Sequence, residues 1–386
     1  MTSTIGIAIL GTGAIASTHI QAFRAFSPRA RIIALCDIYA DKAHALAKEE
    51  GLDVLVFEDY REALRRPDVD LVSICLPPSL HAEAAIAAAR AGKHALIEKP
   101  MAASLEECDR MIAASRSAGT LLSIVAQNRF KDPVVKVKSI IDSGKAGRVL
   151  FSTVNSLWWR GQNYYDLWWR GTWEKEGGGC TLSHAVHHVD LLRWILGMPE
   201  EVSAVISNAN HGNSELEDVS IAILKYAEGS LAQLTTSLVS HGEEQELVFQ
   251  TERARLSIPW KLHVSQAMEN GFPQQDAAGE QEIQAMFDAV PALPYEGHQG
   301  QIDNVLNAIE GKERLLVDGE EGKKTLELIL GMYSSAVRRT PVRFPIAETD
   351  PMYRKETMTA LMPRFHEKKK SIDNFKSAAI TLGRTL

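Results

Sequence analysis

The stretch that decides the fold is "IGIAILGTGAIASTHIQAFRAF", residues 5–26. Its first six residues, 5–10, are almost all apolar and predict a strand buried on both faces. A glycine-rich turn and a helical pattern follow. Gly11 permits a tight turn, Gly13 lets the backbone approach a ligand, and the small Ala16 lets the helix pack on the strand. The N–H groups at the start of such a helix suit a phosphate, so the stretch predicts a phosphate-binding turn.

Asp37 provides a second feature of the same predicted site. It ends the strand pattern "RIIALCD", 26 residues after Gly11. A carboxylate there accepts hydrogen bonds from both ribose hydroxyls of an adenosine and repels a 2′-phosphate. We therefore predict a dinucleotide site that favours NAD over NADP. The alternative is a glycine-rich turn with an unrelated surface aspartate. The expected cofactor-binding residues of this segment are Gly11, Gly13, Ala14, Ile15 and Asp37.

The first 130 residues continue this alternation of strands and helices. Apolar runs at 70–77, 94–99 and 121–127 predict further strands buried on both faces, with alanine-rich helical stretches between them. The pattern predicts a first domain, 1–130, with a parallel sheet covered by helices on both faces.

The pattern changes after about residue 148. Longer segments alternate polar and apolar residues with little helix between them, and "KYAEGSLAQL" (225–234) resembles a hairpin that turns at Glu228–Gly229. This predicts a mostly antiparallel sheet with one buried face. The segments concerned are 148–159, 218–242, 245–259 and 261–270.

The remaining segments complete the expected domain organisation. We expect a substrate-binding and oligomerisation domain over 131–345, whose two late helices, 300–312 and 322–339, pack back on the first domain. Residues 346–386 are charged and weakly periodic. They form either a dimer arm or a partly ordered extension.

Composition excludes several classes of protein. The chain has 386 residues and a net charge of −7, which argues against nucleic acid or an anionic membrane surface as the main partner. No run approaches ~18 consecutive apolar residues, so no spanning helix is expected. The N-terminus has no basic region of a secretory signal, and the four cysteines form no CxxC pair. We therefore expect a cytoplasmic protein with reduced thiols and no cysteine zinc site.

The tripeptide Glu98–Lys99–Pro100 follows the strand pattern that starts at 94, at the edge where open parallel sheets bind ligands. A lysine here can donate a proton to a carbonyl or accept one from an alcohol, and partial burial would lower its pKa toward the useful range. A plain surface salt bridge between Glu98 and Lys99 is the alternative.

The stretch 156–179, "SLWWRGQNYYDLWWRGTWEKEGGG", contains five of the seven tryptophans. Flat aromatic faces can stack on the C–H faces of a pyranose, and arginines can bind hydroxyls or a carboxylate. We interpret the stretch as the lid and wall of a sugar pocket. Alternatively, several rings fill a domain interface or a subunit contact. Trp158 and Trp159 end a strand, and we expect at least one of them to face a sheet or a partner subunit.

Several of these motifs together resemble the GFO/IDH/MocA oxidoreductase family. The matching stretches are "GIAILGTGAIA", "CLPPSLHAEAAIAAARAGKHALIEKP", "RGTWEKEGGG", "HHVDLLRWILG" and "GEEGKKTLELILGMYSSA", which together reach from residue 5 to about 345. The resemblance implies a Rossmann domain followed by an open-faced sheet domain. It places Lys99 near the nicotinamide, in proton transfer, and Glu98 at the nicotinamide ribose. Further cofactor contacts implied in this way are Leu76, Pro77, His81 and Gln127, and substrate contacts are Asn128, Arg129, Trp168, Arg170 and Trp173.

The segment 177–197, "GGGCTLSHAVHHVDLLRWILG", also resembles the family, and we expect one helix over 181–196. His187 matches the family's histidine, whereas Ser183 stands where the family commonly has aspartate or asparagine. On one helix Ser183 and His187 would meet the same ligand, and Asp190 would orient His187. His184, the next residue, could take over part of the role of the aspartate that the family commonly has at position 183. His184 and its neighbour at 188 have metal-ligand spacing, but no metal is expected because the family chemistry needs none.

The resemblance implies an NAD-dependent dehydrogenase that oxidises a hydroxyl of a sugar, a sugar derivative or a cyclitol, reversibly. The expected catalytic residues are Lys99, His187, Ser183 and His184. One alternative is a redox-neutral enzyme of the same fold that uses NAD transiently to cleave or isomerise a glycoside. Others are a non-catalytic NAD-binding regulator and a reductase of a non-sugar carbonyl. The family also implies a homodimer or homotetramer built through the open sheet.

Overall fold

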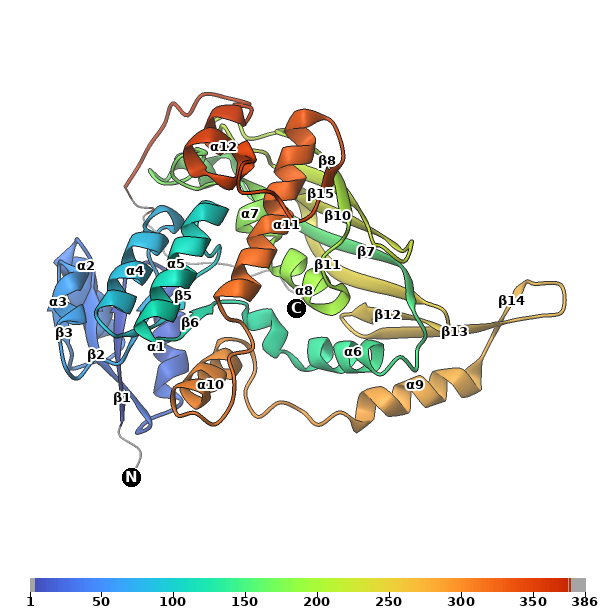
Figure 1. Ribbon diagram of the computed structural model, residues 1–386, viewed down its shortest axis with the longest axis horizontal. Helices are drawn as coiled ribbons and strands as arrows, with labels where there is room; N and C mark the ends of the chain where they lie inside the picture. The colour runs from blue at the N-terminus through green and yellow to red at the C-terminus, as the bar shows by residue number, and fades with distance from the viewer. Residues whose placement is uncertain (1–3, 374, 376–386) are drawn as a thin grey trace.

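The computed structural model describes residues 4–373 and 375. Figure 1 shows a first domain in blue and cyan beside a large green and yellow sheet. The first domain contains a parallel sheet in the order β3-β2-β1-β4-β5-β6. This order confirms the Rossmann fold. The three-residue β3 was not predicted; it is a partly exposed strand at the edge of the sheet, whereas the equally short β6 is buried. The strands are β1 (Ile5–Leu10), β2 (Ala30–Cys36), β3 (Leu55–Phe57), β4 (Leu71–Ile74), β5 (His94–Ile97) and β6 (Leu122–Ile124).

The candidate site lies at the carboxyl ends of these strands. The chain leaves β1 at Gly11, between β2 on one side and β4 on the other, which is the switch point of the sheet. Gly11 has φ +93°, and a Cβ there would lie 2.6 Å from the carbonyl oxygen of Cys75, so only glycine fits. The helices of this domain are α1 (Ala16–Arg24), α2 (Ala40–Glu49), α3 (Tyr60–Leu64), α4 (His81–Arg90) and α5 (Leu105–Ala118).

The second sheet has the order β14-β13-β12-β11-β7-β10-β9-β8-β15 and is antiparallel except between β7 and β10. The hairpin expected at Glu228–Gly229 joins β9 to β10. Side chains alternate between a buried inner face and an outer face that exposes Val205, Ile221 and Ile223. The strands are β7 (Val149–Trp159), β8 (Glu201–Ser207), β9 (Val219–Lys225), β10 (Leu231–Ser237), β11 (Val239–Thr251), β12 (Ala254–Ile258), β13 (Lys261–Ala267), β14 (Pro273–Gln275) and β15 (Val342–Arg343).

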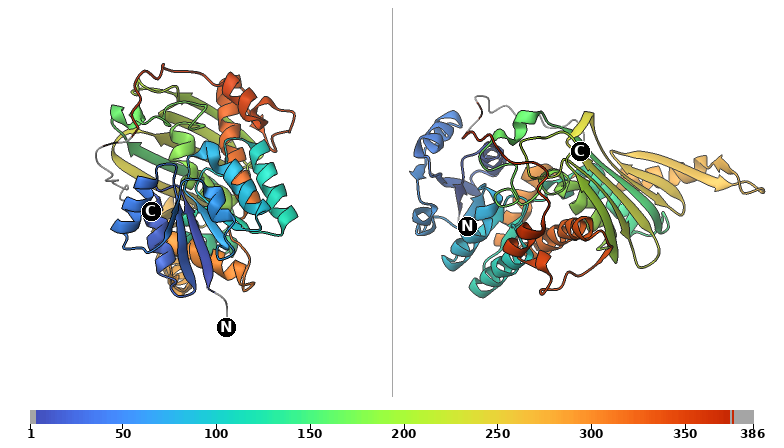
Figure 2. Two further views of the ribbon diagram at one scale, coloured as in Figure 1. Left: turned by 90° about the vertical axis from the view of Figure 1, so that its left-hand side faces the viewer. Right: turned by 90° about the horizontal axis from the view of Figure 1, so that it is seen from above.

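Helices join this sheet to the first domain (Figure 1). α10 contacts α1, and α11 contacts α5 and β6 as well as α8 and β8. Neither α6, which precedes the alternating segments at 148–270, nor α9, which follows them, was predicted from the sequence. The view from above in Figure 2 shows the β13–β14 hairpin and α9 projecting from the body. The helices are α6 (Asp132–Asp142), α7 (Cys180–Ser183), α8 (Val186–Leu196), α9 (Ala277–Ala289), α10 (Gly297–Ile309) and α11 (Gly319–Arg338).

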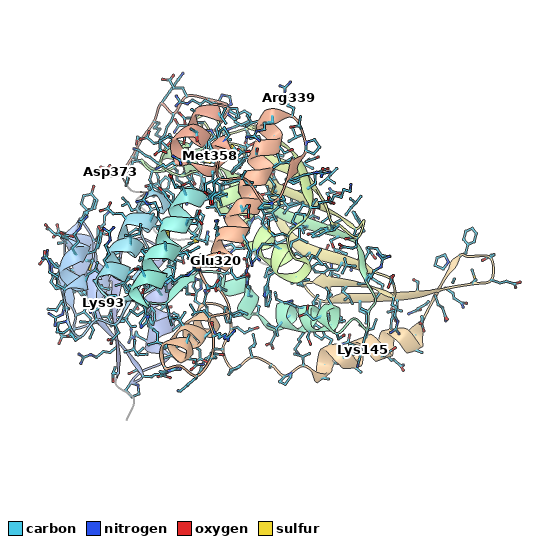
Figure 3. The ribbon with its side chains drawn as sticks, in the orientation of Figure 1. Lys93, Lys145, Glu320, Arg339, Met358 and Asp373 are labelled. Carbon is cyan, nitrogen blue, oxygen red and sulfur yellow. The ribbon has the colours of Figure 1, made fainter. Side chains whose placement is uncertain are left out.

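The C-terminal extension contains the short helix α12 (Lys355–Leu361), which includes Met358. The segment after α12 leads toward the first domain, where Asp373 is labelled in Figure 3. In this segment, Ile372 forms an isolated β-bridge with Leu167 of the aromatic stretch. Residues 374 and 376–386 of the expected extension lie outside the described residues. None of the helices formed by the described residues is long and apolar enough to cross a membrane.

Candidate cofactor and substrate site

The turn after β1 and the end of β2 form one preorganised unit. Asp37 Oδ2 accepts hydrogen bonds from Thr12 N at 2.9 Å and Thr12 Oγ1 at 2.8 Å, and its Oδ1 accepts one from Tyr39 N at 3.0 Å. A Cβ on Gly13 would meet nothing within 4 Å, so this side of the turn is open. Ala14 and Ile15 lead directly into α1. The open turn, the helix start and the fixed carboxylate fit the pyrophosphate and ribose of a dinucleotide.

The turn after β4 is fastened to the loop that carries Lys99. His81 is fully buried, with Nδ1 2.9 Å from the Pro100 carbonyl oxygen and Nε2 2.8 Å from that of Leu76. Both ring nitrogens therefore face the protein backbone. The expectation that His81 borders the nicotinamide does not fit this placement, because its ring ties two loops together. Leu76 and Pro77 are half-buried at the carboxyl end of β4, where a ligand can reach them.

The segment after β6 carries two expected ligand contacts. The side-chain oxygen of Gln127 is buried and has no hydrogen-bond partner among the described residues. A buried acceptor without a partner is costly, so its position suits a donor group of a bound ligand. Asn128 is buried beside it.

Arg129 does not fit its expected substrate contact. It is fully buried and makes a bidentate ion pair with Asp190, at 2.8 and 2.7 Å, and a contact of 3.0 Å with Glu321. Its guanidinium is thus committed to α8 and α11, and its role here is to join two helices.

Glu98 lies at the end of β5 and is nearly buried. Its Oε1 lies 2.9 Å from His19 Nε2, and its Oε2 accepts a hydrogen bond from the backbone N–H of Lys99. Burial alone would raise the pKa of Glu98. The imidazoles of His19 and His298 and the charge of Lys99 outweigh burial and hold that pKa well below its ordinary value. The Glu98 side chain is therefore a carboxylate next to Lys99.

Lys99 connects the two domains. Its Nζ donates to the backbone oxygen of Ser183 at 3.2 Å, from the end of β5 to the end of α7. Burial lowers the pKa of Lys99, the charge of Glu98 opposes this shift, and Arg170 adds to it. A lysine with a lowered pKa can exchange a proton with a substrate more easily than one on the surface.

The helix expected over 181–196 is broken. α7 ends at Ser183 and α8 begins at Val186, with a turn at His184 and Ala185. The argument that Ser183 and His187 share a face of one helix therefore fails.

Ser183, His184 and Tyr164 form a hydrogen-bond chain across this turn. Ser183 Oγ donates to the Gly179 carbonyl oxygen at 2.7 Å and lies 2.8 Å from His184 Nδ1. Since the hydroxyl has only one proton, His184 Nδ1–H donates to it, and Nε2 faces the Tyr164 hydroxyl at 3.5 Å. Burial, with the charges of Arg160 and Arg170, holds the pKa of His184 well below its ordinary value. These groups are occupied by one another, which favours a positioning role.

His187 differs from its neighbours. Asp190 is held by Arg129 and by Thr325 Oγ1 at 2.8 Å, so the expected His187–Asp190 bond is wrong. No hydrogen bond to the His187 imidazole is found among residues 4–373. Burial and the charge of Lys99 hold the pKa of His187 well below its ordinary value, so the ring is neutral. His187 and Lys99 line the same small cavity of about 20 Å³.

The neighbouring His188 is structural. Its Nδ1 lies 2.9 Å from Ser156 Oγ, and the ring is buried beside Trp158. The described residues contain one group with the geometry of a metal site, His19, Glu98 and His298, and it includes neither His184 nor His188.

The aromatic stretch divides between the site and the interior. Arg170 pairs with Glu176 at 2.7 Å, and its guanidinium lies 4.1 Å from the ring centre of Tyr164, which contacts the His184 ring. Trp173 is fully buried, and its indole N–H donates to the Pro363 carbonyl oxygen. The expected substrate contact of Trp173 therefore does not fit its position.

The other tryptophans are nearer the surface. Trp168 is partly exposed, with Lys175 Nζ 5.1 Å from its ring centre. Trp158 lies against His184, at 5.7 Å between ring centres. Trp159 points to the other face of β7, where it is exposed and stacks on His241. The two neighbouring tryptophans thus face the site and the open sheet, respectively.

Glu217 fixes the triple glycine and was not found from the sequence. It is fully buried and accepts hydrogen bonds from Gly179 N (3.0 Å), Thr181 N (3.1 Å) and Tyr333 Oη (2.8 Å). A Cβ on Gly179 would lie 2.0 Å from the Glu217 backbone oxygen, so the glycine is required for this approach. Burial raises the pKa of Glu217 to about 6. No spacing pattern in the sequence indicated that residues 216–220, "LEDVS", pack against the glycines at 177–179.

A surface hollow of about 540 Å³ lies at the opposite edge of the parallel sheet, near the starts of β2 and β3. Two of its arginines are already paired, Arg66 with Asp68 and Arg24 with Glu50. The hollow is remote from Lys99 and plays no part in the site described above.

The comparisons with known proteins agree with this architecture. The model of the oxidoreductase family with an NAD-binding Rossmann fold, GFO/IDH/MocA, matches residues 5–125, and the GFO/IDH/MocA C-terminal domain model matches residues 134–257. Together they cover more than half of the chain. The protein belongs to the GFO/IDH/MocA oxidoreductase family, and its cofactor is a nicotinamide dinucleotide.

Individual relatives give finer comparisons. The chain is 30% identical over 278 residues to the uncharacterized oxidoreductase YrbE of Bacillus subtilis. The aligned region covers 69% of this chain and 78% of that protein. It is 33% identical to inositol 2-dehydrogenase of Gluconacetobacter diazotrophicus, over 58% of this chain and 65% of that one. The WlbA dehydrogenase of Bordetella pertussis, solved in complex with NADH and UDP-GlcNAcA, superposes with a TM-score of 0.77. It is 28% identical over 89% of this chain and 99% of that one.

Proposed function

We propose that the protein is an NAD-dependent dehydrogenase that oxidises a hydroxyl of a sugar, a sugar derivative or a cyclitol, reversibly. The observation that carries the proposal is the position of Lys99. It reaches from the carboxyl edge of the Rossmann sheet to Ser183 of the second domain and lines a cavity with the neutral His187. A proton-transfer group and an imidazole with no hydrogen-bond partner among residues 4–373 therefore line one cavity, together with residues that follow β5 and β6.

The residues of the site divide the chemistry as follows. The bound nicotinamide supplies the hydride acceptor. Lys99, with its lowered pKa, holds the substrate hydroxyl and takes its proton in the oxidation direction. His187, a neutral imidazole with no hydrogen-bond partner among residues 4–373, hydrogen-bonds the same hydroxyl or its neighbour and orients the carbon that loses hydride. Ser183 and His184 keep Tyr164 and the glycine turn in place and do not exchange the proton themselves.

The preference for NAD rests on Asp37. Its carboxylate follows β2, with Oδ2 bound to Thr12 of the turn and Oδ1 bound to Tyr39 N, so a 2′-phosphate there would meet a negative charge. In the same region Gln127, Glu98 and Leu76 are the proposed contacts of the nicotinamide half.

The substrate class rests on Tyr164 and Arg170, which contact each other, and separately on the buried Asn128; these side chains offer a ring face and hydrogen-bond donors. The relatives support a polyhydroxylated ring, since one is an inositol 2-dehydrogenase and another binds UDP-GlcNAcA. We also propose a homodimer or homotetramer through the outer face of the sheet, because Val205, Ile221 and Ile223 are exposed there side by side.

The test is the absorbance of reduced nicotinamide with purified protein, NAD or NADP, and a panel of sugars, uronates and inositols. We expect NADH to form with one class of substrate, and to be lost in Lys99→Ala but not in Lys48→Ala on the surface of α2. Turnover of a glycoside without added NAD, with NAD retained after purification, would instead establish the redox-neutral alternative. Failure of every substrate with either assay would refute the enzymatic proposal.

A further inference from the structure

Three titratable side chains from three separate elements form a cluster next to Lys99. His19 comes from α1, Glu98 from the end of β5, and His298 from the first turn of α10. Glu98 Oε1 lies 2.9 Å from His19 Nε2 and 3.9 Å from His298 Nε2. The two imidazoles meet edge to face, with ring centres 5.3 Å apart. A carboxylate between two imidazoles is an arrangement that can hold or move a proton.

The two histidines have different access to solvent. The His19 side chain is fully buried, and its Nδ1 lies 2.8 Å from Ser73 Oγ, which fixes the ring. The His298 side chain is 19% exposed, whereas that of Glu98 is 9% exposed. Because His298 lies 3.9 Å from the nearly buried Glu98 and is itself partly exposed, it connects the buried cluster to the surface. It is the member of the cluster that can exchange a proton with water.

A metal ion is the other occupant that two histidines and a glutamate could accept. Its charge would lie next to the Lys99 ammonium and beside a nicotinamide ring that is positive in its oxidised form. Glu98 would be the single carboxylate of the ligand set, and its Oε2 already accepts the Lys99 backbone N–H. These charges favour proton transfer over metal binding at the cluster.

We propose that His298 is the residue through which the substrate proton leaves the buried site. The inference rests on the proposed function. In oxidation the substrate O–H bond breaks, the hydride goes to the nicotinamide, and the proton goes to the Lys99 amine. The proton then passes from the ammonium by way of the Glu98 carboxylate, whose Oε1 lies 3.9 Å from His298 Nε2, to the His298 imidazole, which releases it to water. Glu98 stabilises the transient imidazolium by its negative charge. The charged or titratable groups around His298 are His19, Glu98, Lys99, His187 and, next to it on α10, Glu296.

The first experiment does not require a substrate. NAD is mixed with the protein in weakly buffered solution, and proton release is followed with an indicator dye. The positive nicotinamide should drive the Lys99 proton out through His298, so we expect fast release in the wild type and slow release in His298→Gln. His44→Gln, an exposed histidine on α2, is the matched control and should behave as the wild type. Equally fast release in His298→Gln and the wild type overturns the proposal, whether or not any sugar is turned over.

The second experiment uses the substrate identified by the panel. His298→Ala should lower kcat by about tenfold with little change in KM, and added imidazole should restore much of the loss. Restoration by imidazole is not expected of a merely structural histidine. A loss that imidazole does not restore, or stoichiometric tight binding of Zn²⁺ to the purified protein, overturns the proposal. His298-dependent proton release without turnover of any substrate supports the proton path and refutes the proposed dehydrogenase.

Discussion

The two walls of the site are built in different ways. The cofactor wall, residues 11–16, 37 and 76–81, consists of turns that directly follow strands of the Rossmann sheet. The substrate wall, residues 156–188, is a long irregular stretch. Distant parts of the chain hold it: Glu217 under the glycines, Tyr333 of α11, and the C-terminal segment.

Local contacts therefore set the geometry of the cofactor wall, whereas long-range contacts set that of the substrate wall. In the cofactor wall, Asp37 binds Thr12 across neighbouring strands, and the sheet itself supplies the geometry. In the substrate wall, a change far away in the sequence can move the groups that meet the substrate. We therefore expect variants of the cofactor wall to act on the cofactor alone, and remote variants to act on the substrate wall.

The largest expected effect compares two adjacent histidines of the substrate wall. His187→Asn removes an imidazole with no hydrogen-bond partner among residues 4–373, so kcat should fall by about 10²–10⁴ while Tm stays near the wild-type value. His188→Asn breaks the bond to Ser156 in the interior, so Tm should fall and kcat less so. Steady-state kinetics and thermal unfolding distinguish the two. Equal rate losses in both variants would contradict the assignment of His187 to the substrate.

The second prediction concerns Glu217, whose pKa burial raises to about 6 from an ordinary value of 4.5. A raised pKa in the folded state means that its stabilising contribution is complete below about pH 4.5 and is lost as the pH rises through about 6. The wild type should thereby lose about 2 kcal/mol of unfolding free energy across this range, a loss absent from Glu217→Gln. Urea unfolding of both proteins at several pH values measures it, with the exposed Glu269→Gln as the reference. Parallel pH profiles for Glu217→Gln and the wild type would refute it.

The third prediction tests the cofactor wall. Asp37→Ser removes the carboxylate on which the proposed preference for NAD rests, and hydrogen bonds to a charged group contribute roughly 1.5–3 kcal/mol. The ratio of kcat/KM for NAD to that for NADP should fall by about 10- to 100-fold, with the KM of the substrate unchanged. Asp41→Ser, on the surface of α2, should leave the ratio as in the wild type. A large rise in the substrate KM of Asp37→Ser would show that the two walls are not independent.

The same difference explains what the sequence could predict. The turn at Gly11, the carboxylate at Asp37 and the position of Lys99 follow from short patterns next to strands, and the structure places them at one sheet edge. Arg129 and Trp173 were assigned to the substrate, yet they bind Asp190 and Pro363, 61 and 190 residues away. The periodicity of a sequence segment does not predict contacts between residues so far apart in the chain. The break of the expected helix at His184 depends on hydrogen bonds to Gly179 and Tyr164, which are tertiary as well as local.

The smallest expected effect tests how far remote control of the substrate wall extends. Lys368 Nζ donates to the backbone oxygens of Tyr165 and Leu167, two residues that closely follow Tyr164 in the chain. Lys368→Met removes both bonds, so the substrate KM should rise several-fold while the affinity for NAD is unchanged. The neighbouring Lys369 is 77% exposed at its side chain and reaches only Glu367 at 3.9 Å, so Lys369→Met is the matched control. Kinetics with both substrates varied, together with tryptophan fluorescence of the aromatic stretch, measures the effect. If both variants match the wild type, the C-terminal segment covers the substrate wall without setting its geometry, because the contacts on its inner side are then sufficient.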